Sequence, residues 1–182
     1  MNIFAVDTDP IKAAHVLPDK HVTKMILESA QMISIVYSPH YWDIGEVNKV
    51  DGTPFNTVKG AFKNHPCTKW AAKEYHNCAW LIQHSLGLCG EFYRRYGKLH
   101  RLTGSLFETK KLFHREVGEN ITCWKWVDEF ARAMPDEIKF DTSIDDVEAY
   151  RRYLNTKEWA YYNYLRNPSR RPDWLQPNTS NV

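Results

Sequence analysis

The sequence predicts a mainly α-helical protein that folds as a single compact domain, with a few long helices and extended loops. Its 182 residues fit one domain, and its 43% hydrophobic and 25% charged residues are close to the globular average. Apolar residues recur at helical spacing in three long segments, and neither a repeat nor a flexible linker divides the sequence. We therefore expect one domain over residues 1–182.

The first predicted helix runs from Asp19 to about Val36. Its apolar residues follow the i, i+3, i+4, i+7 spacing of a helix with one buried face. Leu17-Pro18-Asp19 supplies the proline and the aspartate that are typical of a helix start. The apolar run Ile3–Val6 before it predicts a brief strand or an extended segment.

A long loop and a second helix follow. Turn-forming residues interrupt segment 38–60, which has no periodicity and which predicts a long loop or lid. Apolar residues recur at helical spacing over 66–96, and Gly97 is placed to end this helix. We expect one long helix here, bent near Gly87 and Gly90.

The carboxy-terminal part of the sequence has weaker patterns. Residues 99–118 are basic and weakly periodic, and residues 121–134 predict a short helix or an extended segment. Residues 135–137 predict a turn, and Asp145–Tyr164 predicts a last helix. Residues 165–182 predict an irregular tail that is rich in basic and aromatic residues.

The net charge of +2 excludes a histone-like polycation and an acidic disordered tail. The charge is uneven, however: residues 1–60 carry 5 basic and 7 acidic side chains, whereas residues 61–120 carry 10 and 5. The four cysteines have no zinc-ligand spacing, so we expect no metal and no cofactor. Without a signal peptide or an apolar span of about 18 residues, we expect a cytoplasmic protein with no membrane partner.

The first candidate site lies on the first predicted helix and contains Asp19, His21 and Glu28. Glu28 follows His21 by seven residues, or two helical turns, so both side chains fall on one stripe. A carboxylate beside an imidazole can divide the roles of acid and base, and the helix start favours an anion such as a sugar phosphate. A surface ion pair or a buried structural pair is the alternative interpretation.

The second candidate site is Asn64-His65-Pro66 at the start of the second predicted helix, with Trp70 one turn later. The imidazole and the first free N–H groups of the helix would point the same way, which suits a phosphate or the edge of a base. The alternative is that Asn64 or His65 only caps the helix.

Clusters of cations predict a nucleic-acid or nucleotide partner. Arg94 and Arg95 lie in the basic middle third, and Arg170, Arg171 and Trp174 lie in the aromatic tail. Guanidinium groups neutralise phosphates, and aromatic rings stack on bases, so this combination is typical of a DNA-binding surface. Solvated surface and protein core are the ordinary alternatives for such residues.

The segment Leu17-Pro18-Asp19-Lys20-His21, with Glu28 seven residues after the histidine, resembles the active-site helix of the phage pyrimidine-dimer DNA glycosylases of the endonuclease V type. Asn64-His65-Pro66 at the second helix and Arg171-Pro172-Asp173-Trp174 near the end of the chain are also similar to that family. The sequence as a whole resembles a group of uncharacterised phage proteins of about this length.

The resemblance implies a small, mainly helical, metal-independent enzyme that moves a nucleotide out of the duplex. In that family an amino-terminal α-amine attacks C1′ of the sugar and forms an imine. The resemblance therefore implies that Glu28 stabilises the sugar intermediate, that His21 assists, and that the amine of Asn2 attacks. It also implies that Asp19, Lys20 and Lys24 lie at the substrate and that the arginines and Trp174 hold the DNA.

The function that we expect is therefore a DNA glycosylase, with abasic-site lyase activity where an amine is available, acting on a damaged or modified pyrimidine in phage or host DNA. Asn2 is a poor second residue for removal of the initiator methionine, so we expect Met1 to remain. Lys20 or Lys24 could replace the amine only if burial lowered its pKa. A non-catalytic DNA- or nucleotide-binding protein and an enzyme that processes free nucleotides or hypermodified bases are the alternatives. A phage-encoded protein would act in the host cytoplasm.

Overall fold

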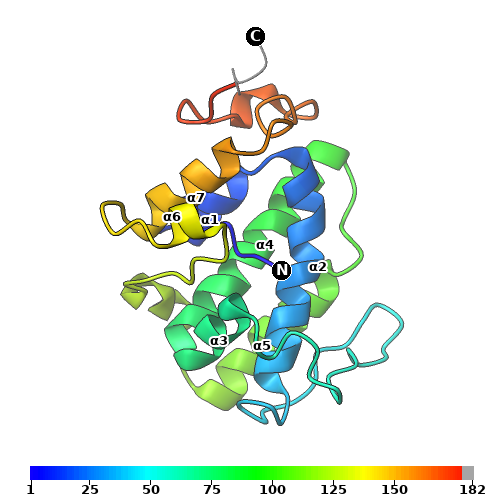
Figure 1. Ribbon diagram of the computed structural model, residues 1–182. Helices are drawn as coiled ribbons and strands as arrows, with labels where there is room; N and C mark the ends of the chain where they lie inside the picture. Colours follow the sequence, from blue (N-terminus) through cyan, green and yellow to red (C-terminus); the bar gives the residue numbers. More distant parts are fainter. Residues whose placement is uncertain (178–182) are drawn as a thin grey trace.

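The computed structural model describes residues 1–177, and helix α4 is its central element. The helix runs through the middle of the molecule and is surrounded by the others (Figure 1). Its neighbours are α1 (Pro10–His15), α2 (Asp19–Tyr37), α3 (Pro66–Lys73), α5 (Thr103–Val117) and the 3₁₀ helix η1 (Ile121–Trp126), while α4 itself spans Tyr75–Tyr96. The mainly α-helical class that the sequence predicts is confirmed, and no strand occurs in the described part of the chain.

Helix α2 begins at the predicted residue and ends one residue later than predicted. Pro18 precedes it in an extended conformation, and Val22, Met25, Ile26 and Ile33 are fully or almost fully buried against the core. Helix α1 was not predicted from the sequence. The Asp9 side chain caps it by accepting the N–H groups of Ile11 and Lys12, and Pro10 occupies its first position.

The predicted single helix over 66–96 is two helices, which is a correction. Glu74 is extended, with φ −141° and ψ 144°, so α3 ends at Lys73 and α4 starts at Tyr75. The Asn77 side chain donates to the carbonyl of Trp70 and thereby satisfies an acceptor that the break leaves free. Gly87 and Gly90 lie inside α4 rather than at the break. Gly97 ends α4 in the left-handed conformation, at φ 67°, as predicted.

The last predicted helix, Asp145–Tyr164, is also too long. Helix α7 spans Asp146–Asn155, and Asp145 caps it through the N–H of Glu148. The helix ends where Asn155 donates to the carbonyls of Arg151 and Trp174, because this tertiary contact replaces a further helical turn. The segment from Thr156 to Tyr164 continues as turns.

The remaining elements are short. Helix α5 forms in the weakly periodic basic segment and η1 in residues 121–134, while the expected turn at 135–137 opens α6 (Asp136–Lys139). Residues 38–65 form a long irregular segment with one isolated bridge, between Asn48 and Pro54, and Ile3–Val6 is not a strand. The predicted tail contains the 3₁₀ turn η2 (Pro168–Arg170), and its residues 178–182 lie outside the described part. No helix within residues 1–177 is both long and apolar enough to span a membrane.

Candidate active site

Glu28 lies on α2 at the bottom of a cavity, where three nitrogen atoms surround its carboxylate. Oε2 accepts the main-chain N–H of Asn2 over 3.0 Å and lies 3.9 Å from the α-amine of Met1. Oε1 lies 3.1 Å from Nζ of Lys24, one helical turn earlier. The Glu28 side chain is only 11% exposed, so its charge is compensated at short range rather than by water.

The amino-terminal segment is folded back so that its first residues face Glu28. The Asn2 side chain donates to the carbonyl of Ala133 over 2.7 Å, and its oxygen accepts the N–H groups of Ile3 and Phe4. Phe4 has φ 42°, a conformation that is uncommon for a bulky side chain and that only surrounding contacts can hold. This tight turn places the amino terminus at the carboxylate.

His21 lies in the same cavity, as the spacing of seven residues to Glu28 predicts. Burial, the larger cause, and the nearby ammonium groups of Lys157, Lys24 and Lys20 together lower the pKa of His21 to about 3. The ring is therefore neutral at physiological pH and can both donate and accept a hydrogen bond. It is in a position to contact a bound sugar but not to supply an imidazolium charge.

The cavity has a volume of about 270 Å³ and is built from three distant parts of the chain. The amino-terminal segment and α2 form its floor, and residues 153–159 form its outer wall. The wall residues are Tyr153, Lys157 and Trp159. Tyr153 and Lys157 were not predicted as site residues, since Tyr153 fits the apolar pattern of a helix. Trp159 belongs to the aromatic and basic carboxy-terminal cluster that predicts base stacking, with a place in the core as the alternative.

His65 caps α3, which was one of the two interpretations left open by the sequence. Its Nδ1 accepts the N–H of Cys67 over 3.2 Å, so the neutral ring carries its proton on Nε2. Burial lowers the pKa of His65, the amino-terminal ammonium adds to this effect, and Glu28 opposes it. His65 therefore lies within electrostatic reach of the candidate site, while Asn64 beside it is exposed.

Asp19 and Arg95, both predicted at the substrate, belong to a buried ion network. Arg95 Nη1 lies 3.0 Å from Asp19 and Arg95 Nε lies 2.9 Å from Glu91, and none of the Arg95 side chain is exposed. Glu91 also contacts Arg170 and Arg94, at 3.1 and 3.5 Å. These contacts join the start of α2 to the end of α4 and to the tail, which is a structural role.

The other expected DNA contacts differ in exposure. Trp70 is buried in the core, where its indole donates to the carbonyl of Glu129 over 2.8 Å. Lys20 and Arg171 are exposed, and each lies over an aromatic ring, Trp159 and Tyr161 respectively. Trp174 is half-buried beneath Arg151, and its carbonyl holds α7. Lys20 and Arg171 are therefore accessible, and so is Arg94 on α4, whose side chain is 52% exposed.

Lys20 and Lys24, the two lysines of α2 at this site, are exposed to solvent. The Lys24 side chain is 63% exposed, and Lys20 also lies in solvent, so the burial that would hold either one neutral is missing. The α-amine of the chain is the amine that lies next to Glu28, 3.9 Å from Oε2, and Met1, which carries it, is half-buried.

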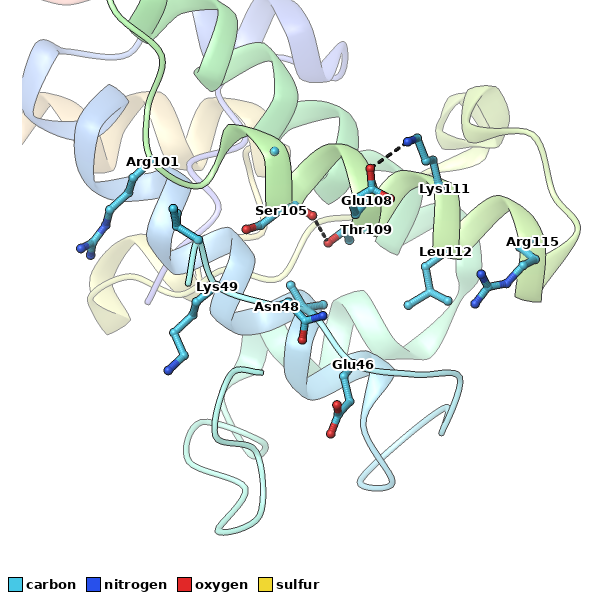
Figure 2. Close-up of a pocket in the computed structure, with 13 residues that line it drawn as sticks. Glu46, Asn48, Lys49, Arg101, Ser105, Glu108, Thr109, Lys111, Leu112 and Arg115 are labelled. Carbon is cyan, nitrogen blue, oxygen red and sulfur yellow. Dashed lines mark hydrogen bonds and ion pairs between the residues drawn. The ribbon is translucent and has the colours of Figure 1, made fainter. Parts of the chain in front are cut away.

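A larger cavity, of about 450 Å³, lies between α5 and residues 46–50 (Figure 2). Lys49 and Arg101 lie at one end of it and Arg115 at the other, with the Glu108–Lys111 pair on α5 between them. It shares no lining residue with the cavity at Glu28. Its lining also contains no buried carboxylate that lies next to an amine. We therefore place the candidate active site at the smaller cavity.

The remaining residues that could bind a metal or react as nucleophiles are the cysteines and the clusters of His, Asp and Glu. The four cysteines are buried and unpaired with one another, and burial raises the pKa of Cys67 to about 12. Within residues 1–177, no group of three or more His, Cys, Asp or Glu side chains is close enough to hold a metal ion.

The comparison with known protein families supports a relation to one enzyme family. A family model described as pyrimidine dimer DNA glycosylase matches residues 1–105, more than half of the chain. No curated protein and no solved structure matches the chain. The matched part includes Glu28, His21 and His65, whereas the outer wall of the cavity at residues 153–159 lies beyond it.

Proposed function

Since the chain belongs to the pyrimidine dimer DNA glycosylase family, we propose that it removes a damaged or modified pyrimidine from DNA and then cleaves the abasic site. The observation that carries this proposal is the pairing of a buried carboxylate with the amino terminus. Glu28 Oε2 lies 3.9 Å from the Met1 amine and 3.0 Å from the Asn2 nitrogen.

The amine is the nucleophile in this proposal. Its lone pair attacks C1′ of the sugar, and the bond from C1′ to the base breaks, so that the base leaves with the bonding electrons and takes up a proton. The nitrogen then loses a proton, the bond from C1′ to the ring oxygen breaks and that oxygen takes up a proton, so that a protonated imine joins the protein to the opened sugar. Loss of a proton from C2′ then breaks the C3′–O bond, so that the 3′ phosphate leaves and the strand is cut at the abasic site. Water finally releases the sugar from the imine and restores the amine. The carboxylate of Glu28 stabilises the positive charge that develops on the sugar and accepts a proton from the nitrogen.

Two nitrogen atoms can fill the role of the amine. In the chain that starts at Met1, the Met1 amine is the free one. If Met1 is removed, the Asn2 nitrogen becomes the free amine, at the shorter distance to Glu28. The neutral ring of His21, in the same cavity, contacts the sugar or orients the water that releases it.

Reduction by borohydride in the presence of DNA with one abasic site tests the proposal. An imine is reduced to a stable covalent adduct, and we expect one adduct per chain that is lost after acetylation of the α-amine. Digestion and mass spectrometry then locate the adduct on Met1 or Asn2. The same duplex without an abasic site is the control and should give no adduct.

A double variant tests whether a lysine rather than the α-amine is the nucleophile. Lys20→Ala with Lys24→Ala should still form the adduct, because neither side chain is buried. An adduct that survives acetylation of the α-amine and disappears in the double variant would contradict the proposed nucleophile. DNA binding with neither an adduct nor release of a base from ultraviolet-irradiated DNA would support a binding protein instead.

A further inference from the structure

Four aromatic rings line the cavity beside Glu28 in a continuous row. The Phe4 ring lies 4.1 Å from His21 and 5.7 Å from Tyr153, centroid to centroid, and is within 5° of parallel to Tyr153. Trp159 meets His21 edge to face at 5.1 Å. Phe4 and His21 are buried, whereas Tyr153 and Trp159 are half-buried at the mouth of the cavity.

A lysine lies over each of the two outer rings. Nζ of Lys157 is 4.1 Å from the centre of Tyr153, and Nζ of Lys20 is 4.7 Å from the centre of Trp159. Cation–π contacts of partly exposed lysines are weak, so a flat group that stacks on the ring can displace them. The displaced ammonium groups then need an anion, and a phosphate beside the stacked group supplies it.

The charge of the cavity also favours a nucleotide. Lys20, Lys24 and Lys157 line it together with the amino terminus, whereas Glu28 is the only carboxylate among its lining residues. The volume of about 270 Å³ lies just below the usual range of ligand pockets, about 300–1,000 Å³. A cavity of this size and charge suits one base with its flanking phosphates.

We propose that Tyr153 and Trp159 hold one extrahelical nucleobase by stacking beside Glu28, while Lys157 and Lys20 bind the phosphates on either side of it. The inference rests on the proposed function, since it places the base of the DNA substrate at the proposed site of reaction. Both rings lie outside residues 1–105, so the proposed stacking surface belongs to a part of the chain that the family model does not cover.

Binding to two bulged duplexes tests this subsite without any requirement for catalysis or for a known lesion. The first duplex carries one unpaired thymine, and the second carries a tetrahydrofuran abasic residue at the same position. We expect the intact protein to bind the thymine bulge at least about fivefold more tightly, because stacking of one base contributes a factor of about five to a hundred.

Variants of the aromatic wall then locate the preference. Trp159→Ala should bind both duplexes with nearly equal affinity, and Trp159→Phe should restore the preference because it keeps an aromatic face. Tyr162→Ala is the matched control, since Tyr162 is an aromatic residue of the same segment that is 64% exposed and outside the cavity. Tyr153→Leu tests the second ring, and its effect decides the question if Trp159→Ala does not fold.

The binding and adduct experiments together distinguish failure of the subsite from failure of the proposed function. Equal binding of the two bulges by the intact protein overturns the subsite, as does an equal loss for both bulges in Trp159→Ala. In either case the borohydride adduct with abasic DNA still forms, so the proposed function stands. Failure of the intact protein to bind either duplex, together with the absence of an adduct, overturns the proposed function itself.

Discussion

The main-chain nitrogen of Asn2 donates to Oε2 of Glu28 over 3.0 Å, across 26 residues of sequence. This contact fixes the amino terminus at the only buried carboxylate of the cavity. Glu28→Gln keeps the shape of the side chain but removes the negative charge. We expect base release and adduct formation to fall by about 100- to 10,000-fold, the usual effect of losing an acid–base group.

DNA binding separates this effect from a loss of folding. Glu28→Gln should bind the tetrahydrofuran duplex about as tightly as the intact protein does, because the cations around the cavity remain. Glu108→Gln is the control, since it makes the same substitution at an exposed carboxylate outside the cavity, and it should keep the activity. A Glu28→Gln protein that no longer unfolds cooperatively would show that Glu28 is structural.

The buried network of Arg95 predicts a large effect on stability. Arg95→Leu leaves the buried carboxylate of Asp19 without a cation, whereas Glu91 keeps Arg170 and Arg94, and breaking a buried ion pair in this way costs about 3–5 kcal/mol. We expect the free energy of unfolding, measured with urea, to fall by that amount. Lys111→Ala removes an exposed ion pair with Glu108 and should leave the urea midpoint unchanged.

The same variant tests the role that the sequence suggested for Arg95. A DNA contact would weaken DNA binding while the protein stayed as stable as before. An Arg95→Leu protein of unchanged stability and reduced DNA affinity would therefore show that Arg95 contacts DNA.

The sequence predicts much of the helical structure and the pair at the floor of the candidate site. Helical periodicity predicted α2 almost to the residue, and the seven-residue spacing correctly put His21 and Glu28 on one face. Both observations are local, because residues seven apart on one helix lie on one stripe whatever surrounds them.

Tertiary contacts decided the parts that the sequence did not predict. The break at Glu74 has no proline or glycine beside it, and it depends on Asn77 reaching the carbonyl of Trp70. The basic cluster could not show that Arg95 is buried between two carboxylates. The wall at Tyr153 and Trp159 meets Glu28 only after folding, since more than 120 residues separate them.

The burial of His84 leads to a prediction of how the free energy of unfolding depends on pH. The ring is fully buried, and neither nitrogen has a hydrogen-bond partner among residues 1–177. Burial lowers the pKa of His84 to about 3. The unfolded chain, with a histidine pKa near 6.5, therefore binds a proton that the folded protein does not, and stability falls as the pH drops from about 6.5 towards 3.

His84→Leu removes this contribution. Between pH 6 and pH 5 the variant should lose about 1.4 kcal/mol less stability per pH unit than the intact protein, measured by urea unfolding at each pH. At pH 7 it should be at least as stable, because two unpaired polar atoms leave the core. His114→Ala, at an exposed position, is the control and should keep the original slope. Equal slopes for His84→Leu and the intact protein would contradict the buried neutral ring.

Helix α1 packs closely on α4 at Gly87, and this leads to a prediction for an alanine at this position. A Cβ at this position would lie 3.0 Å from Cβ of Ala14 and 3.1 Å from Cδ1 of Ile11. Ala14 is held by the backbone of α1 and has no freedom to move aside, so Gly87→Ala should overpack the contact. The cost of overpacking, about 1–3 kcal/mol, exceeds the gain in helix propensity of about 1 kcal/mol. We expect a net loss of about 1 kcal/mol in the free energy of unfolding.

Gly90, one turn later on the same helix, is the matched control for this prediction. It is exposed, and the nearest atom to an added Cβ is Nη1 of Arg94 at 4.0 Å. Gly90→Ala should therefore show the propensity gain alone and stabilise the protein by about 0.5–1 kcal/mol. Thermal and urea unfolding of both variants give the comparison. If both glycines responded to alanine with the same sign, the close approach of α1 to α4 would not limit the residue at position 87.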